Sequence, residues 1–173
     1  MLATALTVIA IVTQDQSVLR AAPRESAAQH AVLWQGDSLE VRGVKGDYLQ
    51  VYDHRRERAG YLRASQVRQQ ALKPENAPEL LAVVRFLRDT PGAEALGISY
   101  AAAYLKAAPA QAIDGDVFDA LGTFAERLAR RATVRQGKTP DTTVGAHVEV
   151  AAAYGVVMVS IERDDQVQLY YDS

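Results

Sequence analysis

Hydrophobic and polar residues alternate over the first seventy positions, and the spacing then becomes helical. Short runs rich in Val, Leu and Tyr are separated by turn residues, the pattern typical of β-strands. Seven such runs within about 60 residues leave no room for crossover helices, so the pattern predicts a small antiparallel β-barrel. The predicted strands cover residues 7–12, 17–20, 31–33, 38–42, 47–52, 60–63 and 65–67.

The second part of the chain is Ala-rich, and its apolar residues recur at intervals of three and four. This spacing predicts amphipathic helices with short connections, which pack as an antiparallel bundle. The expected helices cover residues 78–90, 93–107, 116–132 and 142–155. Asp116 is the expected N-cap of the third helix, and Thr142 or Thr143 that of the fourth.

Two further features divide the chain. Residues 73–78 contain two prolines, which disfavour both a helix interior and a central strand, so a linker is expected there. Alternating residues on both sides of Asp164-Asp165 predict a β-hairpin over residues 156–172. The predicted protein is therefore α+β, with a barrel over residues 1–72 and a helical unit ending in the hairpin over residues 79–173.

Four segments of the first part carry a family resemblance: residues 18–23 (VLRAAP), 32–36 (VLWQG), 46–51 (GDYLQV) and 60–62 (GYL). In order and spacing, residues 8–68 resemble a bacterial Src homology 3 (SH3b-like) domain. Tyr48 and Tyr61 stand where the family usually has Trp, and Ala21-Ala22 stands where it usually has Ser-Gly. The resemblance implies an SH3-like β-barrel that recognises a peptide or a cell-wall peptide.

Composition and charge narrow the classes of function. Hydrophobic residues make up 49% of the chain, which predicts a globular protein with a core. The formal charge of −2 has the wrong sign for a dedicated partner of nucleic acid or of an anionic membrane, so neither is expected. There is no cysteine, which excludes disulfides, a thiolate nucleophile and Cys-ligated zinc.

The beginning of the chain bears on location. The apolar run over residues 2–12 is shorter than the roughly 20 residues that a membrane-spanning helix needs, so no direct membrane insertion is expected. The run also lacks the basic segment of a secretory signal. A periplasmic or cell-envelope location is favoured if a signal peptide has been removed, and a cytoplasmic one otherwise.

No catalytic motif, phosphate-binding loop or metal-ligand spacing occurs in the sequence. His147 and Glu149 are close in sequence, but residues two apart on a helix point about 200° away from each other, so they cannot share a metal ion or a proton. His30 and His54 lie in predicted loops without ligand spacing. No metal and no cofactor are therefore expected.

Aromatic and basic residues of the predicted barrel form the candidate ligand site. Aromatic rings on a small barrel can line a groove for an extended peptide, and arginines of a loop can pair with a carboxylate. We expect Tyr52 or Trp34 to be partly exposed. The candidate ligand-binding residues are Trp34, Tyr48, Tyr52, Arg55, Arg56 and Tyr61.

The sequence thus predicts a non-enzymatic binding or scaffold protein with a peptide, a cell-wall peptide or a protein as its partner, and with the oligomeric state left open. Two alternatives remain. In one, the barrel is an accessory domain of a cell-envelope enzyme whose site lies between barrel and helices and uses Glu149, His147 or Asp116. In the other, the protein is structural and its helical unit is an oligomerisation surface.

Overall fold

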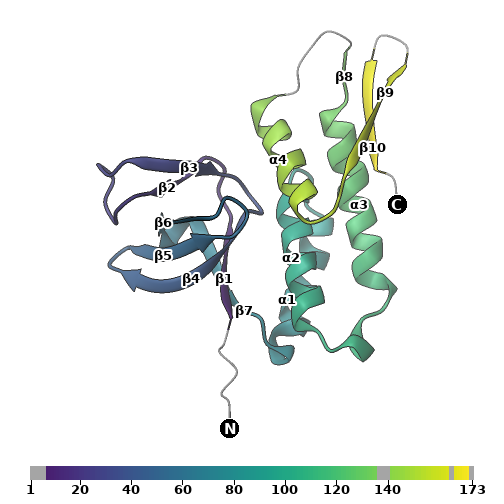
Figure 1. Ribbon diagram of the computed structural model, residues 1–173. Helices are drawn as coiled ribbons and strands as arrows, with labels where there is room; N and C mark the ends of the chain where they lie inside the picture. Colours follow the sequence, from purple (N-terminus) through teal and green to yellow (C-terminus); the bar gives the residue numbers. More distant parts are fainter. Residues whose placement is uncertain (1–6, 136–140, 164–165, 172–173) are drawn as a thin grey trace.

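A computed structural model describes residues 7–135, 141–163 and 166–171 of the chain. An antiparallel sheet lies on one side and a group of helices on the other (Figure 1). We call residues 7–71 the sheet part and residues 77–171 the helical part. The predicted α+β class is confirmed.

The sheet part holds seven strands in the spatial order β3-β2-β6-β5-β4-β1-β7. The outermost strands, β3 and β7, do not pair with each other in the described chain, so the sheet is open where a closed barrel was predicted. The pairing between β2 and β6 is short, because only Arg20 and Tyr61 are partners there. The strands are β1 (Val8–Val12), β2 (Ser17–Arg20), β3 (Gln29–Leu33), β4 (Ser38–Lys45), β5 (Tyr48–Asp53), β6 (Arg58–Arg63) and β7 (Val67–Ala71).

The position of β7, the last strand of the sheet part, differs most from the prediction. A strand was predicted at residues 65–67, but Ala64–Gln66 form a turn of 3-10 helix and β7 follows it. β7 pairs with β1 along its whole length, from Val8 opposite Ala71 to Val12 opposite Val67. Residues 68–70 are polar, so the pairing with β1 makes them a strand where the hydrophobic pattern does not.

Strand β1 belongs to two hydrophobic clusters at once. Ala10 and Val12 face the aliphatic core of the sheet, together with leucines such as Leu19 and Leu62. Ile11 points to the other side and is buried among the helices. The alternation of a single strand therefore joins the two cores, because successive side chains of a strand point to opposite faces.

All four predicted helices are present: α1 (Ala77–Arg88), α2 (Glu94–Ala107), α3 (Gly115–Ala132) and α4 (Thr142–Ala153). Their N-caps differ from the expected residues. Asp114 caps α3, accepting a hydrogen bond from the Asp116 amide at 2.9 Å, and Asp141 caps α4 through the Thr143 amide at 2.8 Å. Both α3 and α4 start just after an aspartate, whose short carboxylate reaches the second amide beyond it.

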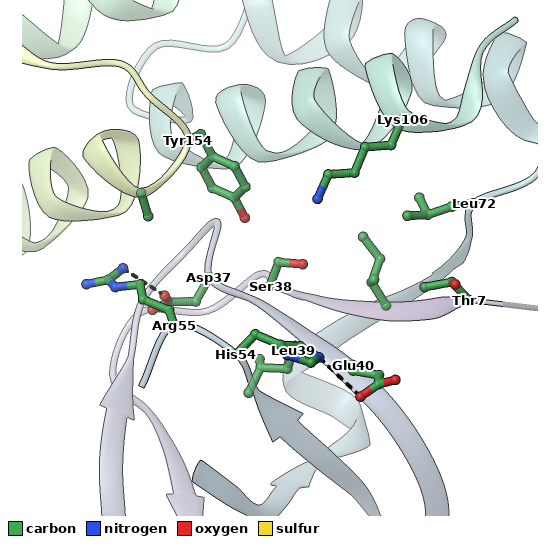
Figure 2. Close-up of a pocket in the computed structure, with 12 residues that line it drawn as sticks. Thr7, Asp37, Ser38, Leu39, Glu40, His54, Arg55, Leu72, Lys106 and Tyr154 are labelled. Atoms are coloured by element: carbon green, nitrogen blue, oxygen red, sulfur yellow. Dashed lines mark hydrogen bonds and ion pairs between the residues drawn. The ribbon is translucent and has the colours of Figure 1, made fainter. Parts of the chain in front are cut away.

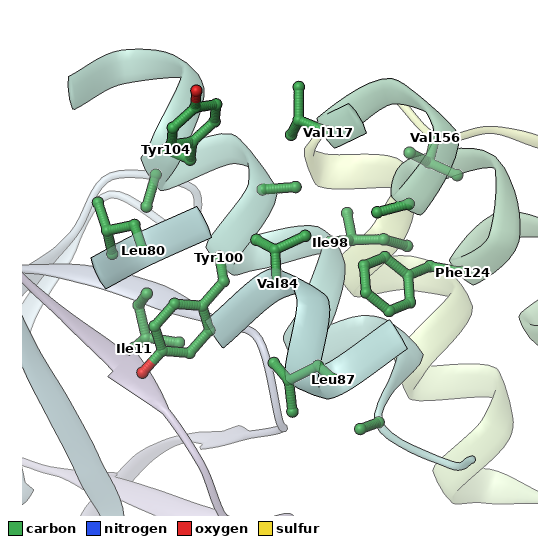
Figure 3. Close-up of a cluster of buried hydrophobic side chains, with 14 of the residues drawn as sticks. Ile11, Leu80, Val84, Leu87, Ile98, Tyr100, Tyr104, Val117, Phe124 and Val156 are labelled. Atoms are coloured by element: carbon green, nitrogen blue, oxygen red, sulfur yellow. The ribbon is translucent and has the colours of Figure 1, made fainter. Parts of the chain in front are cut away.

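The core of the helical part lies between α1, α2 and α3 (Figure 3). Small residues let the helices approach, and the ring of Phe124 packs directly against Gly97 of α2. A Cβ at position 97 would fall inside the van der Waals radius of that ring. The labelled core side chains are Ile11, Leu80, Val84, Leu87, Ile98, Tyr100, Tyr104, Val117, Phe124 and Val156.

The predicted C-terminal hairpin is confirmed as β9 (Met158–Arg163) paired with β10 (Gln166–Tyr171). Its predicted turn at Asp164-Asp165 lies outside the described residues. An additional strand, β8 (Val134–Arg135), pairs with β10 and lies outside the predicted elements. β10 also lies along α3, so the hairpin packs on the helices as expected.

The connection between the two parts is short. A 3-10 turn at Pro74–Asn76 follows Lys73 and leads directly into α1. The division into two domains at residues 73–78 stays a prediction. In the described part of the chain, no helix is both long and apolar enough to cross a membrane.

Candidate functional site

The three candidate tyrosines lie on one face of the sheet. Tyr48 is opposite Arg63, Tyr52 opposite Ala59 and Tyr61 opposite Gln50, and directly opposed residues point to the same side. This is the outer face, because Leu49 and Val51, which alternate with them on β5, point into the core. The register of β5 and β6 therefore brings the three tyrosines to the outer face of the sheet.

The rings of two of these tyrosines already have partners. Tyr48 is only 6% exposed, and the Arg63 guanidinium carbon lies 5.1 Å from its ring centroid. The Arg42 guanidinium carbon lies 4.3 Å from the ring centroid of Tyr52, and the ring of His54 meets Tyr52 edge-on. Tyr52 is half-buried, as is Trp34, which lies apart from this face in the turn after β3. Arginines thus occupy stacking faces of Tyr48 and Tyr52 that were expected to contact a ligand.

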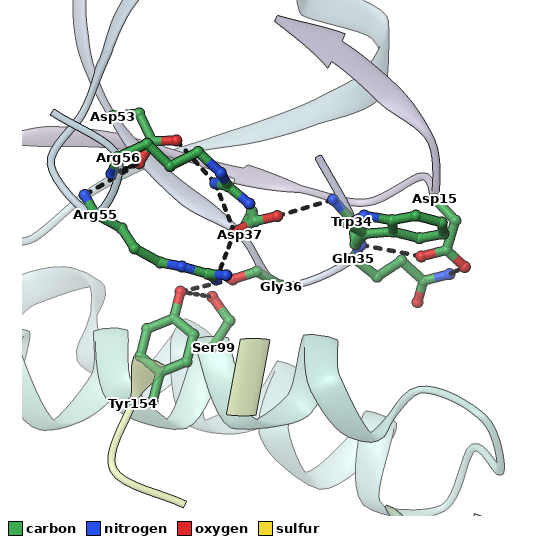
Figure 4. A network of polar contacts seen from close by, with 10 residues as sticks. All are labelled: Asp15, Trp34, Gln35, Gly36, Asp37, Asp53, Arg55, Arg56, Ser99 and Tyr154. Carbon is green, nitrogen blue, oxygen red and sulfur yellow. Dashed lines mark hydrogen bonds and ion pairs between the residues drawn. The ribbon is translucent and has the colours of Figure 1, made fainter. Parts of the chain in front are cut away.

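Arg55 and Arg56, the other candidate ligand residues, bind carboxylates of the sheet part (Figure 4). Arg56 donates to Asp53 at 2.8 Å and to Asp37 at 3.4 Å, and Arg55 donates to Asp37 at 3.3 Å. Burial by itself would lower the pKa of Arg56, but the hydrogen bond to Asp53 and the charge of Asp37 raise it above its ordinary value. The two arginines therefore compensate buried negative charge.

The carboxylate of Asp37 organises a turn, residues 34–37, that touches the helices. Asp37 accepts a hydrogen bond from the Trp34 amide at 2.9 Å, and Gly36 has a positive φ of 93°. A Cβ on Gly36 would lie 2.5 Å from the carbonyl oxygen of Ala95 in α2. Only glycine fits both the conformation and the space, so the turn docks by close backbone approach.

Tyr154, at the end of α4, bonds this turn to the helices. Its hydroxyl donates to the Gly36 carbonyl at 2.6 Å and lies 2.9 Å from the Ser99 hydroxyl (Figure 4). Because a phenol carries a single proton, Ser99 is the donor to Tyr154. Burial, reinforced by the nearby Asp37 carboxylate, raises the pKa of Tyr154, so the hydroxyl keeps the proton that it donates.

A second polar link joins the β1–β2 turn to the helices. Nε2 of His147 lies 2.8 Å from Oδ1 of Asp15, and Nδ1 lies 3.4 Å from a guanidinium nitrogen of Arg131. Arginine only donates, so Nδ1 accepts from Arg131 and the N–H at Nε2 donates a hydrogen bond to Asp15. Arg131 also pairs at 2.9 Å with Glu94, which is 2% exposed. His147 is therefore a buried bridge between the two parts.

The catalytic candidates of the enzyme alternative lie in different surroundings. His147 is engaged with Asp15, whereas Asp116 forms ion pairs with Arg85 and Arg88 between α3 and α1. Glu149 is exposed. The structure does not bring these three side chains to one site.

A cleft of about 600 Å³ lies between the sheet part and the helical part, and we call it the junction cleft (Figure 2). β1, β4 and the β5–β6 loop form one wall, and α2 with the end of α4 forms the other. The lining residues are Thr7, Ile9, Asp37, Ser38, Leu39, Glu40, His54, Arg55, Leu72, Lys106, Ala153 and Tyr154.

Most charges of the junction cleft are paired. Arg55 is held by Asp37. Glu40 lies 3.0 Å from Nε of Arg42 and 3.2 Å from Nε2 of His54, and the hydrogen bond from Arg42 is the main cause that lowers the pKa of this carboxyl. Lys106 differs, because no hydrogen bond or ion pair links it to any of the described residues. The cleft thus presents one cation that is open to a ligand.

A shallow extension continues the junction cleft along α4. Glu149 and Ala152 line this extension, which shares His54, Arg55 and Ala153 with the cleft. The two hollows form one path from Lys106 toward Glu149. An elongated ligand suits this shape better than a compact one.

The sequence points to only two of the residues that line the junction cleft and its extension: Arg55, expected on the barrel surface, and Glu149, a candidate for catalysis. Lys106 is the one cation of α2, in a segment otherwise dominated by alanine and large apolar residues. This isolated charge is the feature of the sequence that could have identified Lys106 as a candidate. Ser38 and Thr7 carry no such signal, because strands and strand ends often expose hydroxyls. Their position beside α2 depends on how the sheet docks.

Metal binding is not indicated by the described side chains, among which no group of three or more His, Cys, Asp or Glu is arranged to hold an ion. The expected absence of a metal and of a cofactor stays a prediction. Comparisons of the chain with protein-family models, with curated proteins and with solved structures find no match. The resemblance to bacterial Src homology 3 domains therefore also stays a prediction.

Proposed function

We propose that the protein is a non-enzymatic binding module whose ligand lies in the junction cleft. The observation that carries the proposal is the unpaired ammonium of Lys106 in a cleft of about 600 Å³ that is otherwise charge-balanced. This volume is within the range of about 300–1,000 Å³ that ligand sites occupy. Such sites combine apolar walls with a few polar groups, as Ile9, Leu72 and Lys106 do here.

A short peptide, including a cell-wall peptide, is the ligand that we propose. The path from Lys106 to Glu149 supports it, because an extended chain fills an elongated groove and offers opposite charges at its two ends. The covered rings of Tyr48 and Tyr52 make the outer face of the sheet the less suitable surface.

We also propose that the sheet is a variant of the SH3-like fold. The antiparallel meander β4-β5-β6 supports this, as does Gly46, whose φ of 59° suits the tight turn before Tyr48. In this proposal, the barrel does not close through further strand pairs. Instead, β1 and β7 extend the sheet at one edge, and the sheet contacts the helices.

Binding is tested by calorimetry of the full chain with muropeptides and with a library of short peptides. We expect Lys106→Ala to weaken binding and Lys45→Ala to leave it unchanged, because Lys45 is exposed at the far end of β4. Tyr52→Ala tests the outer face in the same titrations. Unchanged binding by Lys106→Ala, together with loss in Tyr52→Ala, would move the ligand from the junction cleft to the sheet surface.

A second candidate function is self-association through the helical part. Phe86 of α1 and Phe118 of α3 are exposed by 69% and 54%, and each lies within two residues of the Arg85–Asp116 ion pair that joins their helices. Exposed aromatic rings of this size are typical of protein contact surfaces. Sedimentation of the protein and of a Phe86→Ser, Phe118→Ser double variant over a range of concentrations tests this candidate.

A further inference from the structure

We infer that the junction cleft recognises one carboxylate, the free C-terminal carboxylate of a short peptide with an aliphatic last residue. This inference rests on the proposed function and names the chemistry of its ligand. Figure 2 shows the Lys106 ammonium pointing across the cleft toward the hydroxyl of Ser38. An anion placed between these two groups would receive an ion pair from one wall and a hydrogen bond from the other.

The charges of the cleft match a single negative charge. Arg55 is neutralised by Asp37, and Glu40 by Arg42 and His54, which leaves Lys106 as the cation without an ion pair in the part of the lining that the structure describes. A phosphate monoester carries about two negative charges at neutral pH and needs more than one cation. The balance therefore favours a carboxylate.

The helices add to this preference. Lys106 is in the last turn of α2, and Ala153 is the last residue of α4, so both helices reach the cleft with their C-terminal ends. The C-terminus of a helix carries partial negative charge, which stabilises the lysine and opposes any anion, an anion of two charges more strongly than a carboxylate. The site has no helix N-terminus among its described lining elements to compensate.

Apolar side chains beside the lysine supply the second part of the recognition. Ile9 of β1 and Leu72, just after β7, also line the cleft, and both are partly buried against the helical core. Figure 2 shows Leu72 close to Lys106 in this view. An aliphatic side chain can pack on Ile9 and Leu72 while its carboxylate reaches Lys106. The lysine ammonium is a compact point charge with three donors, and it can pair with one oxygen of a carboxylate.

The test is calorimetry of the full chain with a matched pair of ligands, acetyl-Ala-Ala-Val as the free acid and as the C-terminal amide. We expect the acid to bind at least about tenfold more tightly than the amide, the size of one charged hydrogen bond. Lys106→Gln should lower the affinity for the acid to that for the amide and leave the amide unchanged. Lys73→Gln, at an exposed residue outside the cleft, is the control.

The outcomes separate this inference from the proposed function. Equal binding of acid and amide, unaffected by Lys106→Gln, would overturn the carboxylate inference while leaving a peptide-binding cleft. If inorganic phosphate displaced the acid at a lower concentration than acetate does, the inference that the bound group carries a single negative charge would be overturned. Failure of both peptides, the muropeptides and the library to bind would overturn the proposed function itself.

Discussion

The two parts of the molecule bury their hydrophobic residues in different ways. The core of the sheet contains branched aliphatic side chains and alanine and no aromatic ring among its described members. The helical core combines many alanines with a few large rings such as Phe124, Tyr100 and Tyr104. Strand spacing is set by backbone hydrogen bonds, whereas helices approach only as closely as their side chains allow. Small residues therefore matter most where helices cross.

Buried charge shows a related contrast. In the sheet part, the buried carboxylates Asp37 and Asp53 are held by arginines from a single loop. In the helical part, Glu94 of α2 is held by Arg131 from another helix, α3. Between the parts, Ile11 of β1 is buried in the helical core, the backbone of Gly36 approaches α2 closely, and hydrogen bonds of Tyr154 and His147 link the surfaces. The junction thus combines apolar burial with close backbone approach and polar links.

The largest effect is expected when the sheet part is separated from the helical part. Limited proteolysis should cut near Lys73, which is exposed, and release a folded sheet fragment, because that part has its own aliphatic core. The fragment exposes Ile11 and is expected to be less stable than the intact chain. Circular dichroism and thermal melting of the purified fragment provide the measurement. An unfolded fragment would show that the two parts share one core.

The docking of the turn at residues 34–37 is tested by Gly36→Ala. The new Cβ meets the Ala95 carbonyl at 2.5 Å in a backbone with φ of 93°, so the free energy of unfolding should fall by about 3 kcal/mol. Gly92→Ala is the matched control, because Gly92 has the same φ and open space around it, and we expect a loss of about 1 kcal/mol. Urea denaturation measures both. Equal losses would mean that the close approach to α2 contributes nothing.

The dependence of the helical core on small residues is tested by Gly97→Ala. Its Cβ would overlap the ring of Phe124, and we expect a loss of about 1–3 kcal/mol in the free energy of unfolding. Gly122→Ala in α3 meets no atom within 4 Å and should stabilise the protein by roughly 0.5–1 kcal/mol through helix propensity. Changes of the same sign in urea denaturation would contradict this account of helix packing.

The smallest effect concerns Tyr154 and pH. Burial raises its pKa above the ordinary value of 10.0, so the folded state holds the proton more tightly than the unfolded state. That stabilisation is present in full below about pH 10 and is lost as the pH rises through the higher folded value. Tyr154→Phe should cost about 1 kcal/mol at neutral pH, because the Gly36 carbonyl loses its donor.

The same variant should flatten the alkaline dependence of stability. Between about pH 9 and pH 11, the free energy of unfolding of Tyr154→Phe is expected to fall less steeply than that of the parent protein. Ser99→Ala keeps the phenol but removes a hydrogen bond that lowers its pKa, so its alkaline slope should be at least as steep as that of the parent. Identical slopes in the parent and in Tyr154→Phe would show that this proton is not linked to folding.

The local order of the chain could be predicted from its residues. Alternation identified β1 to β6, helical spacing identified α1 to α4, and the C-terminal alternation identified the hairpin. These patterns succeed because a side chain's face follows from its position within a few residues of strand or helix. The predicted N-caps differed from the observed ones by at most two positions: Asp116 was predicted where Asp114 caps α3, and Thr142 or Thr143 where Asp141 caps α4.

The candidate site depended on contacts between distant segments. His147 finds Asp15 across 132 positions, Tyr154 finds Gly36 across 118, and Lys106 faces Ser38 through the docking of α2 beside β4. Arg55 and Arg56 looked available in the sequence, but Asp37, buried in a different turn, binds both. Local periodicity specifies which face of an element is apolar. Only the fit between the sheet part and the helical part determines what packs on that face. The same fit determines which polar groups lie at the junction.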